Sequence, residues 1–407
     1  MILSPIDRLQ ALNPLAEIWW DSSPLVFDDW RNKMLASAPD AAKGELRSQL
    51  DRLIDFGGGE AGAFRGCTTN PPLSLSAVKS APEKWNARID VLAGENPGLD
   101  AAALSWILYK EIIGRGAEFF RGLWETSGGR YGYVSGQLDP RLFTETDLMI
   151  SQAREIAALA PNVMVKVPAS TQGINVLRAV TAEGIPTNVT TCFTVPQVMA
   201  AARATREGLA IAAKNGVDIK RWRAVITLML ARLTEREVLT EQARERGIEL
   251  TQADRKWFGL AVFKRSYRLL REGGYPSKLL LCSVRTGPVV AGRTAYWDIE
   301  EVAGGNIVYT LPPVALTPLF ALADTMEWRS DAIDREVPAD SLARILQTPY
   351  GLQSYDPNGL SADQFDTHPA TLFTVAEFSR SASGLEDHVA ARLAERSGKA
   401  GAKGGRG

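Results

Sequence analysis

The stretch Asn162–Pro168, which reads NVMVKVP, decides the fold of this chain. Its β-branched residues predict a short buried strand, because valines fit the pleated surface of a sheet. Side chains alternate along a strand, so the valines share one face while Met164 and Lys166 share the other. In a closed parallel barrel the valine face packs on surrounding helices. Lys166 then points into the barrel.

Similar short apolar runs alternate with longer helical patterns up to about residue 311. Eight strands separated by helices predict a parallel sheet, and eight strands are enough to close a (β/α)8 TIM barrel. The other predicted strands are Glu17–Asp21, Ala63–Asn70, Gly132–Asp139, Ile185–Phe193, Ala224–Leu230, Lys278–Ser283 and Asn306–Leu311. The predicted helices include Thr144–Leu159, Gly173–Glu183, Pro196–Asn215 and Ala253–Glu272.

The C-terminal part of the chain extends beyond the eighth predicted strand. We predict one domain over residues 1–397, of which 312–397 form a C-terminal helical extension with a loop that includes PYGLQSYDPNGL. This extension could close over one mouth of the barrel or pack elsewhere, and the sequence leaves both alternatives open. The Gly- and Lys-rich end GKAGAKGGRG (398–407) predicts a disordered tail.

Composition narrows the class of protein. The chain has 46 basic and 47 acidic side chains, which argues against a nucleic-acid partner bound through bulk positive charge. No apolar run reaches the roughly 18 residues that a membrane helix needs, and the N-terminus has no basic segment followed by an apolar one. We expect a cytoplasmic protein without a membrane partner. A homodimer is compatible with the sequence, which does not fix the oligomeric state.

Cysteine and histidine usage excludes several chemistries. The three cysteines are far apart and lie in or next to apolar runs, so we expect small buried side chains and no disulfide framework. The two histidines, His368 and His388, both lie near the C-terminus. A zinc site typically uses a cluster of histidines, and a Ser-His-Asp site needs one in the catalytic body. We therefore expect no metal and no cofactor.

Polar side chains come at the ends of seven of the predicted strands. The active site of a parallel barrel lies at the carboxyl ends of its strands, so these side chains converge on one mouth. Burial penalises the charged form of an inward lysine and yields the neutral amine that a Schiff-base nucleophile requires. A lysine that supports the fold by pairing with a carboxylate is the alternative, which the residues alone leave open. The converging residues are Asp21, Thr69, Asn70, Gln137, Lys166, Asn188, Thr190, Arg232, Ser283 and Arg285.

Four segments resemble the strand-end motifs of the transaldolase family in order and spacing, and WWD at 19–21 fits the first-strand aspartate of that family. The resemblance covers residues 12–315, about three quarters of the chain. Together the four motifs are far more specific than a lone TTNP. They are CTTNPPLSL (67–75), VSGQLDPRLFTET (134–146), MVKVPAS (164–170) and IPTNVTTCF (185–193).

The resemblance implies a class I aldol mechanism without a metal. Lys166 would form a Schiff base with a ketose carbonyl, and Asp21 would be the acid/base for the hydroxyl beside the cleaved bond. Asn70 and Asn188 would bind the hydroxyls of the three-carbon dihydroxyacetone unit. Thr190 would hold a water molecule that carries protons.

The resemblance also implies a phosphorylated sugar substrate. Arg232 matches the sixth-strand arginine of the family, and Ser283 and Arg285 match its seventh-strand Ser-x-Arg. Two guanidinium groups and a hydroxyl suit a phosphate dianion, because arginine presents paired donors to its oxygens.

Two departures bear on the reaction. Gln137 replaces the third-strand glutamate of transaldolases, as in fructose 6-phosphate aldolases, and an amide cannot take a proton at neutral pH. Those aldolases pair the glutamine with a tyrosine, whereas the aligned residue here is Met229, and Thr227 replaces a substrate-side serine. Transfer of a dihydroxyacetone unit is the leading hypothesis. A lyase or specialised biosynthetic aldolase is the rival, and a non-catalytic sugar-phosphate-binding protein is a third alternative.

Overall fold

Eight parallel strands close into a barrel in the order β1-β10-β7-β6-β5-β4-β3-β2, which confirms the predicted (β/α)8 architecture. The computed structural model describes residues 3–55 and 62–404. Each barrel strand falls within a predicted run. The strands are β1 (Glu17–Asp21), β2 (Phe64–Thr68), β3 (Tyr133–Gln137), β4 (Val163–Pro168), β5 (Thr187–Cys192), β6 (Ala224–Met229), β7 (Lys278–Cys282) and β10 (Val308–Leu311), with a hairpin of β8 (Val289–Val290) and β9 (Arg293–Thr294) before the last.

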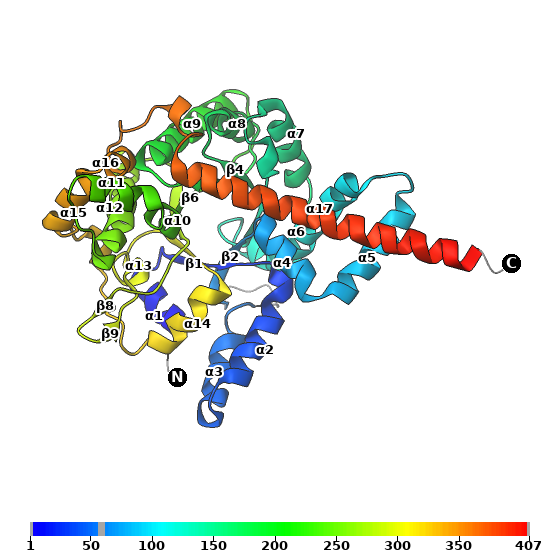
Figure 1. Cartoon of the computed structure of the whole chain (residues 1–407), viewed down its shortest axis with the longest axis horizontal. Helices are drawn as coiled ribbons and strands as arrows, with labels where there is room; N and C mark the ends of the chain where they lie inside the picture. Colours follow the sequence, from blue (N-terminus) through cyan, green and yellow to red (C-terminus); the bar gives the residue numbers. More distant parts are fainter. Residues whose placement is uncertain (1–2, 56–61, 405–407) are drawn as a thin grey trace.

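Helices surround the barrel (Figure 1), and the four predicted by range are α7, α8, α9 and α12, with ends within two residues of the prediction. The helices before β7 are α1 (Pro5–Ala11), α2 (Phe27–Ser37), α3 (Asp40–Asp51), α4 (Pro71–Ser80), α5 (Pro82–Glu95), α6 (Ala101–Thr126), α7 (Thr146–Ala157), α8 (Thr171–Ala182), α9 (Val195–Lys214), α10 (Leu230–Thr234), α11 (Glu237–Glu245) and α12 (Gln252–Glu272). Those after β7 are α13 (Trp297–Glu300), α14 (Pro313–Leu322), α15 (Ala339–Leu346), α16 (Pro349–Tyr355) and α17 (Pro369–Gly404). Short 3-10 turns are η1 (Pro24–Val26), η2 (Pro140–Leu142), η3 (Ala332–Asp334) and η4 (Ala362–Gln364).

Trp19 of β1 fills the middle of the barrel next to a glycine. β1 and β2 are paired so that Trp19 stands opposite Gly66, and a Cβ atom on Gly66 would lie 2.7 Å from the indole ring. Only a residue without a side chain leaves room for the tryptophan. Glu17 and Asp21, two residues away on either side, therefore share the inward face of β1, one at each end of the barrel.

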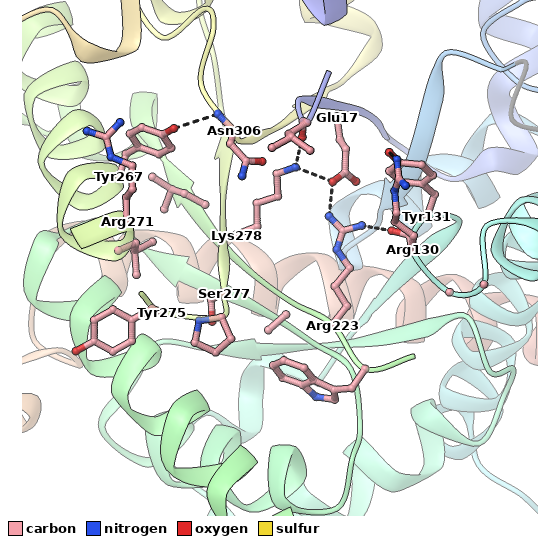
Figure 2. Close-up of a pocket in the computed structure, with 18 of the residues that line it drawn as sticks. Glu17, Arg130, Tyr131, Arg223, Tyr267, Arg271, Tyr275, Ser277, Lys278 and Asn306 are labelled. Atoms are coloured by element: carbon pink, nitrogen blue, oxygen red, sulfur yellow. Dashed lines mark hydrogen bonds and ion pairs between the residues drawn. The ribbon is translucent and has the colours of Figure 1, made fainter. Parts of the chain in front are cut away.

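An ion-pair cluster occupies the amino end of the barrel. Glu17 is buried and accepts hydrogen bonds from Lys278 Nζ at 2.8 Å and from Arg223 (Figure 2). Burial alone raises the pKa of Glu17, but the two cations outweigh it and lower the pKa below its usual value. A cavity of about 640 Å³ opens beside this cluster. It lies at the opposite end from the carboxyl ends of the strands, so we interpret the cluster as a structural element.

The long helix α17 crosses the carboxyl-end mouth of the barrel. It packs against α4, η2 and α10, which follow β2, β3 and β6, and against β5 itself. Figure 1 shows it running diagonally over the barrel. The C-terminal extension therefore does close over one mouth, whereas α15 and α16 pack outside on α12.

Both ends of α17 add detail that the sequence did not supply. His368, just before α17, is buried between the rings of Tyr350 and Phe193, with centroids 5.0 Å and 6.4 Å away. Burial lowers its pKa to about 4, so this ring is neutral and serves packing.

At the C-terminal end of α17 the helical backbone continues to Gly404, through most of the segment for which the sequence predicts disorder. Residues 405–407 lie outside the described residues. Alanine and lysine favour continuation of a helix that has already formed.

No helix within the described ranges is both long enough and apolar enough to cross a membrane.

Candidate active site

Lys166 points into the barrel, as the alternation in NVMVKVP predicts. Its side chain is 1% exposed, and its Nζ atom donates a hydrogen bond to the carbonyl oxygen of Thr69 at 3.3 Å. Burial lowers the pKa of Lys166, while the negative charge of Asp21 acts in the opposite direction. The buried environment thus favours the neutral, nucleophilic form of the amine.

Asp21 is the buried carboxyl group whose negative charge acts on Lys166. It accepts a hydrogen bond from Thr68 Oγ1 at 2.6 Å, and the thiol of Cys282 lies 3.9 Å from its other oxygen. Burial raises the pKa of Asp21, and the positive charge of Lys166 opposes that shift. Within the described part of the chain no direct hydrogen bond or ion pair joins Asp21 to Lys166. A substrate can therefore use both groups without first breaking an ion pair.

Asn188 is held beside the lysine by two hydrogen bonds. Pairing of β4 with β5 sets it opposite Lys166. Its amide nitrogen donates to Ser135 Oγ at 2.9 Å, and Thr227 Oγ1 donates to its carbonyl oxygen at 2.7 Å. Because the two contacts come from two other strands, β3 and β6, the amide has one orientation. Thr227, predicted to be a substrate-binding residue, positions Asn188 in this structure.

Gln137 and Thr190 carry polar atoms that have no hydrogen-bond partner among the described residues. Pairing of β3 with β4 sets Gln137 opposite Lys166, and the hydroxyl of Tyr109 fixes the backbone of Gln137 at 3.0 and 3.1 Å. Gln137 Oε1 and Thr190 Oγ1 are buried, and neither finds a hydrogen-bond partner among the described residues. An unsatisfied buried polar atom costs about 1–3 kcal/mol. Both atoms are therefore suited to bind a ligand group or a water molecule.

Asn70 lies at the mouth as the N-cap residue of α4. Its side-chain oxygen accepts a hydrogen bond from the backbone N–H of Leu73 at 2.9 Å, a contact that stabilises the start of a helix. The amide nitrogen can donate, and the second lone pair of this oxygen can accept, in the hydroxyl-binding role that the sequence predicts.

The two arginines predicted to bind phosphate face carboxylates in this structure. Arg232, in α10 directly after β6, makes two hydrogen bonds of 2.8 Å to Glu377 of α17. Arg285 is half exposed, and its Nε atom lies 3.5 Å from Glu235. Ser283 has a left-handed backbone with φ of 60°, and its carbonyl oxygen accepts the N–H of Ala231 at 3.0 Å. The phosphate role of these three residues stays a prediction.

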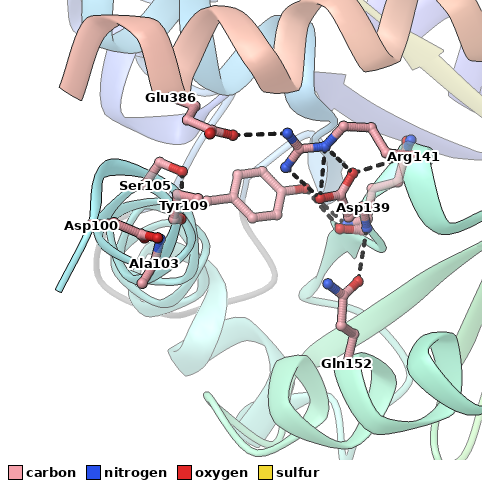
Figure 3. A network of polar contacts seen from close by, with 10 residues as sticks. Asp100, Ala103, Ser105, Tyr109, Asp139, Arg141, Gln152 and Glu386 are labelled. Carbon is pink, nitrogen blue, oxygen red and sulfur yellow. Dashed lines mark hydrogen bonds and ion pairs between the residues drawn. The ribbon is translucent and has the colours of Figure 1, made fainter. Parts of the chain in front are cut away.

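A polar network holds the end of β3 against α17 (Figure 3). The side chain of Arg141 donates three hydrogen bonds to Asp139, the shortest 2.7 Å, and reaches Glu386 of α17 at 2.8 Å. Gln152 accepts the backbone N–H of Asp139 at 3.0 Å. The Asp-Pro-Arg part of the third-strand motif is therefore a docking point for α17, and it keeps the neighbouring Gln137 in place.

Several residues of the site were not singled out from the sequence. Ser135 could have been found by counting two residues back from Gln137 on the same face of β3. Thr310 of β10 makes a close contact with Thr68, and the same alternation indicates it. Nothing local to Glu377 indicates that it would meet Arg232. All three cysteines are buried, as predicted, and Cys282 also contacts Asp21.

These features define a class of protein: an α/β barrel whose buried amine and carboxyl group lie at the carboxyl ends of its strands, where barrel enzymes carry their catalytic groups. Residues 54–348 match the family model described as Transaldolase/Fructose-6-phosphate aldolase. The chain therefore belongs to this family.

Curated relatives agree with the family match. A transaldolase of Saccharopolyspora erythraea is 30% identical over 67% of this chain and 74% of its own length. A transaldolase of Mycobacterium leprae is 28% identical over 72% of this chain and 79% of its own. A transaldolase of Mycolicibacterium paratuberculosis is 29% identical over 75% of this chain and 84% of its own. The similarity supports a transaldolase-type enzyme.

Proposed function

We propose that this protein transfers a dihydroxyacetone unit from a ketose phosphate to an aldehyde acceptor through a Schiff base on Lys166. The observation that carries the proposal is the fully buried amine of Lys166, whose pKa is lowered by burial, close to a carboxyl group that does not pair with it directly. A structural lysine would be expected to pair with that carboxylate.

The proposed reaction begins at the C2 carbonyl of the ketose. Lys166 Nζ adds to this carbon, and the carbonyl oxygen leaves as water after it has been protonated, which gives an iminium ion. Asp21 then takes the proton of the C4 hydroxyl as the C3–C4 bond breaks, and the bonding electrons move into the iminium to form an enamine. After the first aldehyde leaves, C3 of the enamine attacks the acceptor aldehyde, and Asp21 returns the proton to the new C4 oxygen. Water then adds to C2 of the regenerated iminium ion, which releases the ketose product and the free amine of Lys166.

The surroundings of Asp21 support this double role. Burial raises its pKa toward neutrality, which is where a group that both accepts and donates a proton works best. The hydrogen bond from Thr68 holds one carboxyl oxygen, so the orientation of the group is fixed. Asn188, held by Ser135 and Thr227, is in place to meet a hydroxyl of the three-carbon unit.

Gln137 favours a second candidate function, a lyase of the fructose 6-phosphate aldolase type. Its buried Oε1 atom can hold a water molecule but cannot take a proton from it. The two functions differ in what captures the enamine: an acceptor aldehyde in the transferase, and a proton in the lyase. Met229, the buried last residue of β6, supplies no hydroxyl that would complete the aldolase pattern.

Turnover of a ketose phosphate with and without an aldehyde acceptor separates these functions. A transferase releases its first aldehyde in a single equivalent and continues only when an acceptor is present. A lyase releases free dihydroxyacetone without one. Borohydride reduction during either reaction should fix a three-carbon adduct on Lys166, and absence of any adduct with every ketose donor would refute the Schiff-base proposal.

A further inference from the structure

Glu377 of α17 occupies the edge of the Arg232 guanidinium that a phosphate would bind. Its two carboxylate oxygens each lie 2.8 Å from a terminal nitrogen of Arg232. The ring of Phe378, the next residue, covers the flat face of the same guanidinium, with its centroid 5.0 Å away. Paired charge-assisted bonds of this kind are how arginine binds phosphate as well as carboxylate. One anion must leave before the other can bind in the same way.

We propose that Glu377 is a specificity-determining residue whose carboxylate competes with the substrate phosphate for Arg232. This inference rests on the proposed function, since it assigns the anion-binding place of the same site. The exchange of Glu377 for phosphate sets how strongly the enzyme prefers phosphorylated over unphosphorylated donors.

The charges around Glu377 favour its exchange for phosphate over a permanent ion pair with Arg232. Besides Arg232, the guanidinium groups of Arg380 and Arg236 also lower the pKa of Glu377. The positive charge of these three guanidinium groups suits a phosphate dianion that takes the place of the carboxylate at Arg232. Arg236 Nε is buried without a hydrogen-bond partner in the described part of the chain. A phosphate that replaced Glu377 at Arg232 would find a further donor close by.

The position of α17 makes this exchange relevant to substrate entry. Lys166 is 1% exposed and Asp21 is 7% exposed, and α17 crosses the mouth of the barrel at which their strands end. Among the described residues of α17, Glu377 and Glu386 are the acidic ones whose ion pairs tie the helix to the barrel mouth, and Glu386 pairs with Arg141. When phosphate takes the place of Glu377 at Arg232, α17 loses this tie to the barrel mouth. The helix is then loosened at the point nearest to the bound phosphate.

The first test measures binding of inorganic phosphate by titration calorimetry, independently of turnover. Glu377→Gln keeps the shape of the side chain and removes its charge, so this variant should bind phosphate at least tenfold more tightly than wild type. Adding Arg232→Gln to that variant should remove the gain. Glu386→Gln is the matched control, because it removes the other acidic tie of α17 without touching Arg232, and it should leave phosphate affinity unchanged.

The second test compares donors. Glu377→Gln should lower KM for a phosphorylated ketose by a similar factor with kcat within about twofold, and should leave KM for the unphosphorylated ketose unchanged. Equal phosphate affinity in Glu377→Gln and wild type, or an equal gain in Glu386→Gln, would overturn the proposal. Thermal denaturation of each variant confirms that it is folded. Because phosphate binding does not need the Schiff base, a missing borohydride adduct would refute the proposed function and leave this test valid.

Discussion

Lys166 on β4 and Asp21 on β1 are buried in the same barrel interior, separated by β2 and β3, and each charge favours the charged form of the other. Burial acts against both charges and is the larger effect for each group. The pKa of the carboxyl group therefore rises while that of the amine falls. Opposite pKa shifts of this kind in a carboxyl group and an amine are typical of groups that exchange protons with a substrate.

Schiff-base formation should be confined to Lys166. Borohydride reduction in the presence of a ketose phosphate should add a three-carbon unit to this residue, which peptide mass spectrometry can locate. Lys264 is an internal control, since it is also buried with its pKa lowered to about 8, but it donates to the carbonyl oxygens of Ala332 and Arg335. An adduct on Lys264, or one that survives Lys166→Met, would contradict the assignment.

Replacing Asp21 should shift the pH dependence of the trapping reaction. The negative charge of Asp21 raises the pKa of Lys166, so Asp21→Asn should lower that pKa further. Because the neutral amine attacks the carbonyl, the rate of adduct formation should then rise at a lower pH than in wild type. Turnover should fall by roughly 100- to 10,000-fold, the usual contribution of a positioned acid/base. An unchanged pH profile would show that the two groups do not interact.

A carboxylate at residue 137 should restore ordinary transaldolase turnover. We expect weak transfer in wild type and an increase of at least about tenfold in Gln137→Glu, or roughly 1.4 kcal/mol, since the new group can take a proton. The gain is reduced because like-charge repulsion also raises the pKa of Asp21. Fast transfer by wild type together with slower transfer by Gln137→Glu would show that this glutamine does not mark a changed reaction.

Arg232 and Arg285 should matter only for phosphorylated donors. Replacing either one by Gln removes a charge-assisted contact of about 2–4 kcal/mol, which corresponds to roughly a 30- to 1,000-fold loss in kcat/KM. The loss should largely disappear with an unphosphorylated ketose. Equal losses with both donors would mean that these arginines support the fold.

The Glu17 cluster at the other end of the barrel should control stability in acid. The pKa of Glu17 is lowered in the folded protein, so its contribution is present above its ordinary value of 4.5 and is lost as the pH falls through the folded value. Glu17→Gln should cost about 3–5 kcal/mol at pH 7, because Arg223 and Lys278 lose their shared partner. Urea denaturation at pH 7 and pH 3.5 should show a smaller pH effect in the variant. An equal pH effect would assign acid sensitivity to other groups.

The sequence by itself determined the barrel and the direction of its key side chains. Alternation in NVMVKVP is a local property, because successive side chains of a strand point to opposite faces. It therefore predicts that Lys166 points inward without any knowledge of the contacts that the lysine makes. Eight such runs separated by helices have few other ways to bury their apolar faces. Strand-end residues such as Asp21, Gln137 and Asn188 then meet at one mouth as a consequence of parallel pairing.

Only the tertiary structure decided how that mouth is covered. Glu377 and Arg232 are 145 positions apart in the chain, and their contact depends on the direction in which α17 crosses the barrel. Helix propensity and apolar spacing are the same whether α17 lies over the mouth or along the outside, so no local pattern distinguishes the two arrangements. The same holds for Asn188, whose contacts with Ser135 and Thr227 come from two other strands. Such contacts depend on the packing of whole elements, which is fixed only when all of the apolar surfaces are buried together.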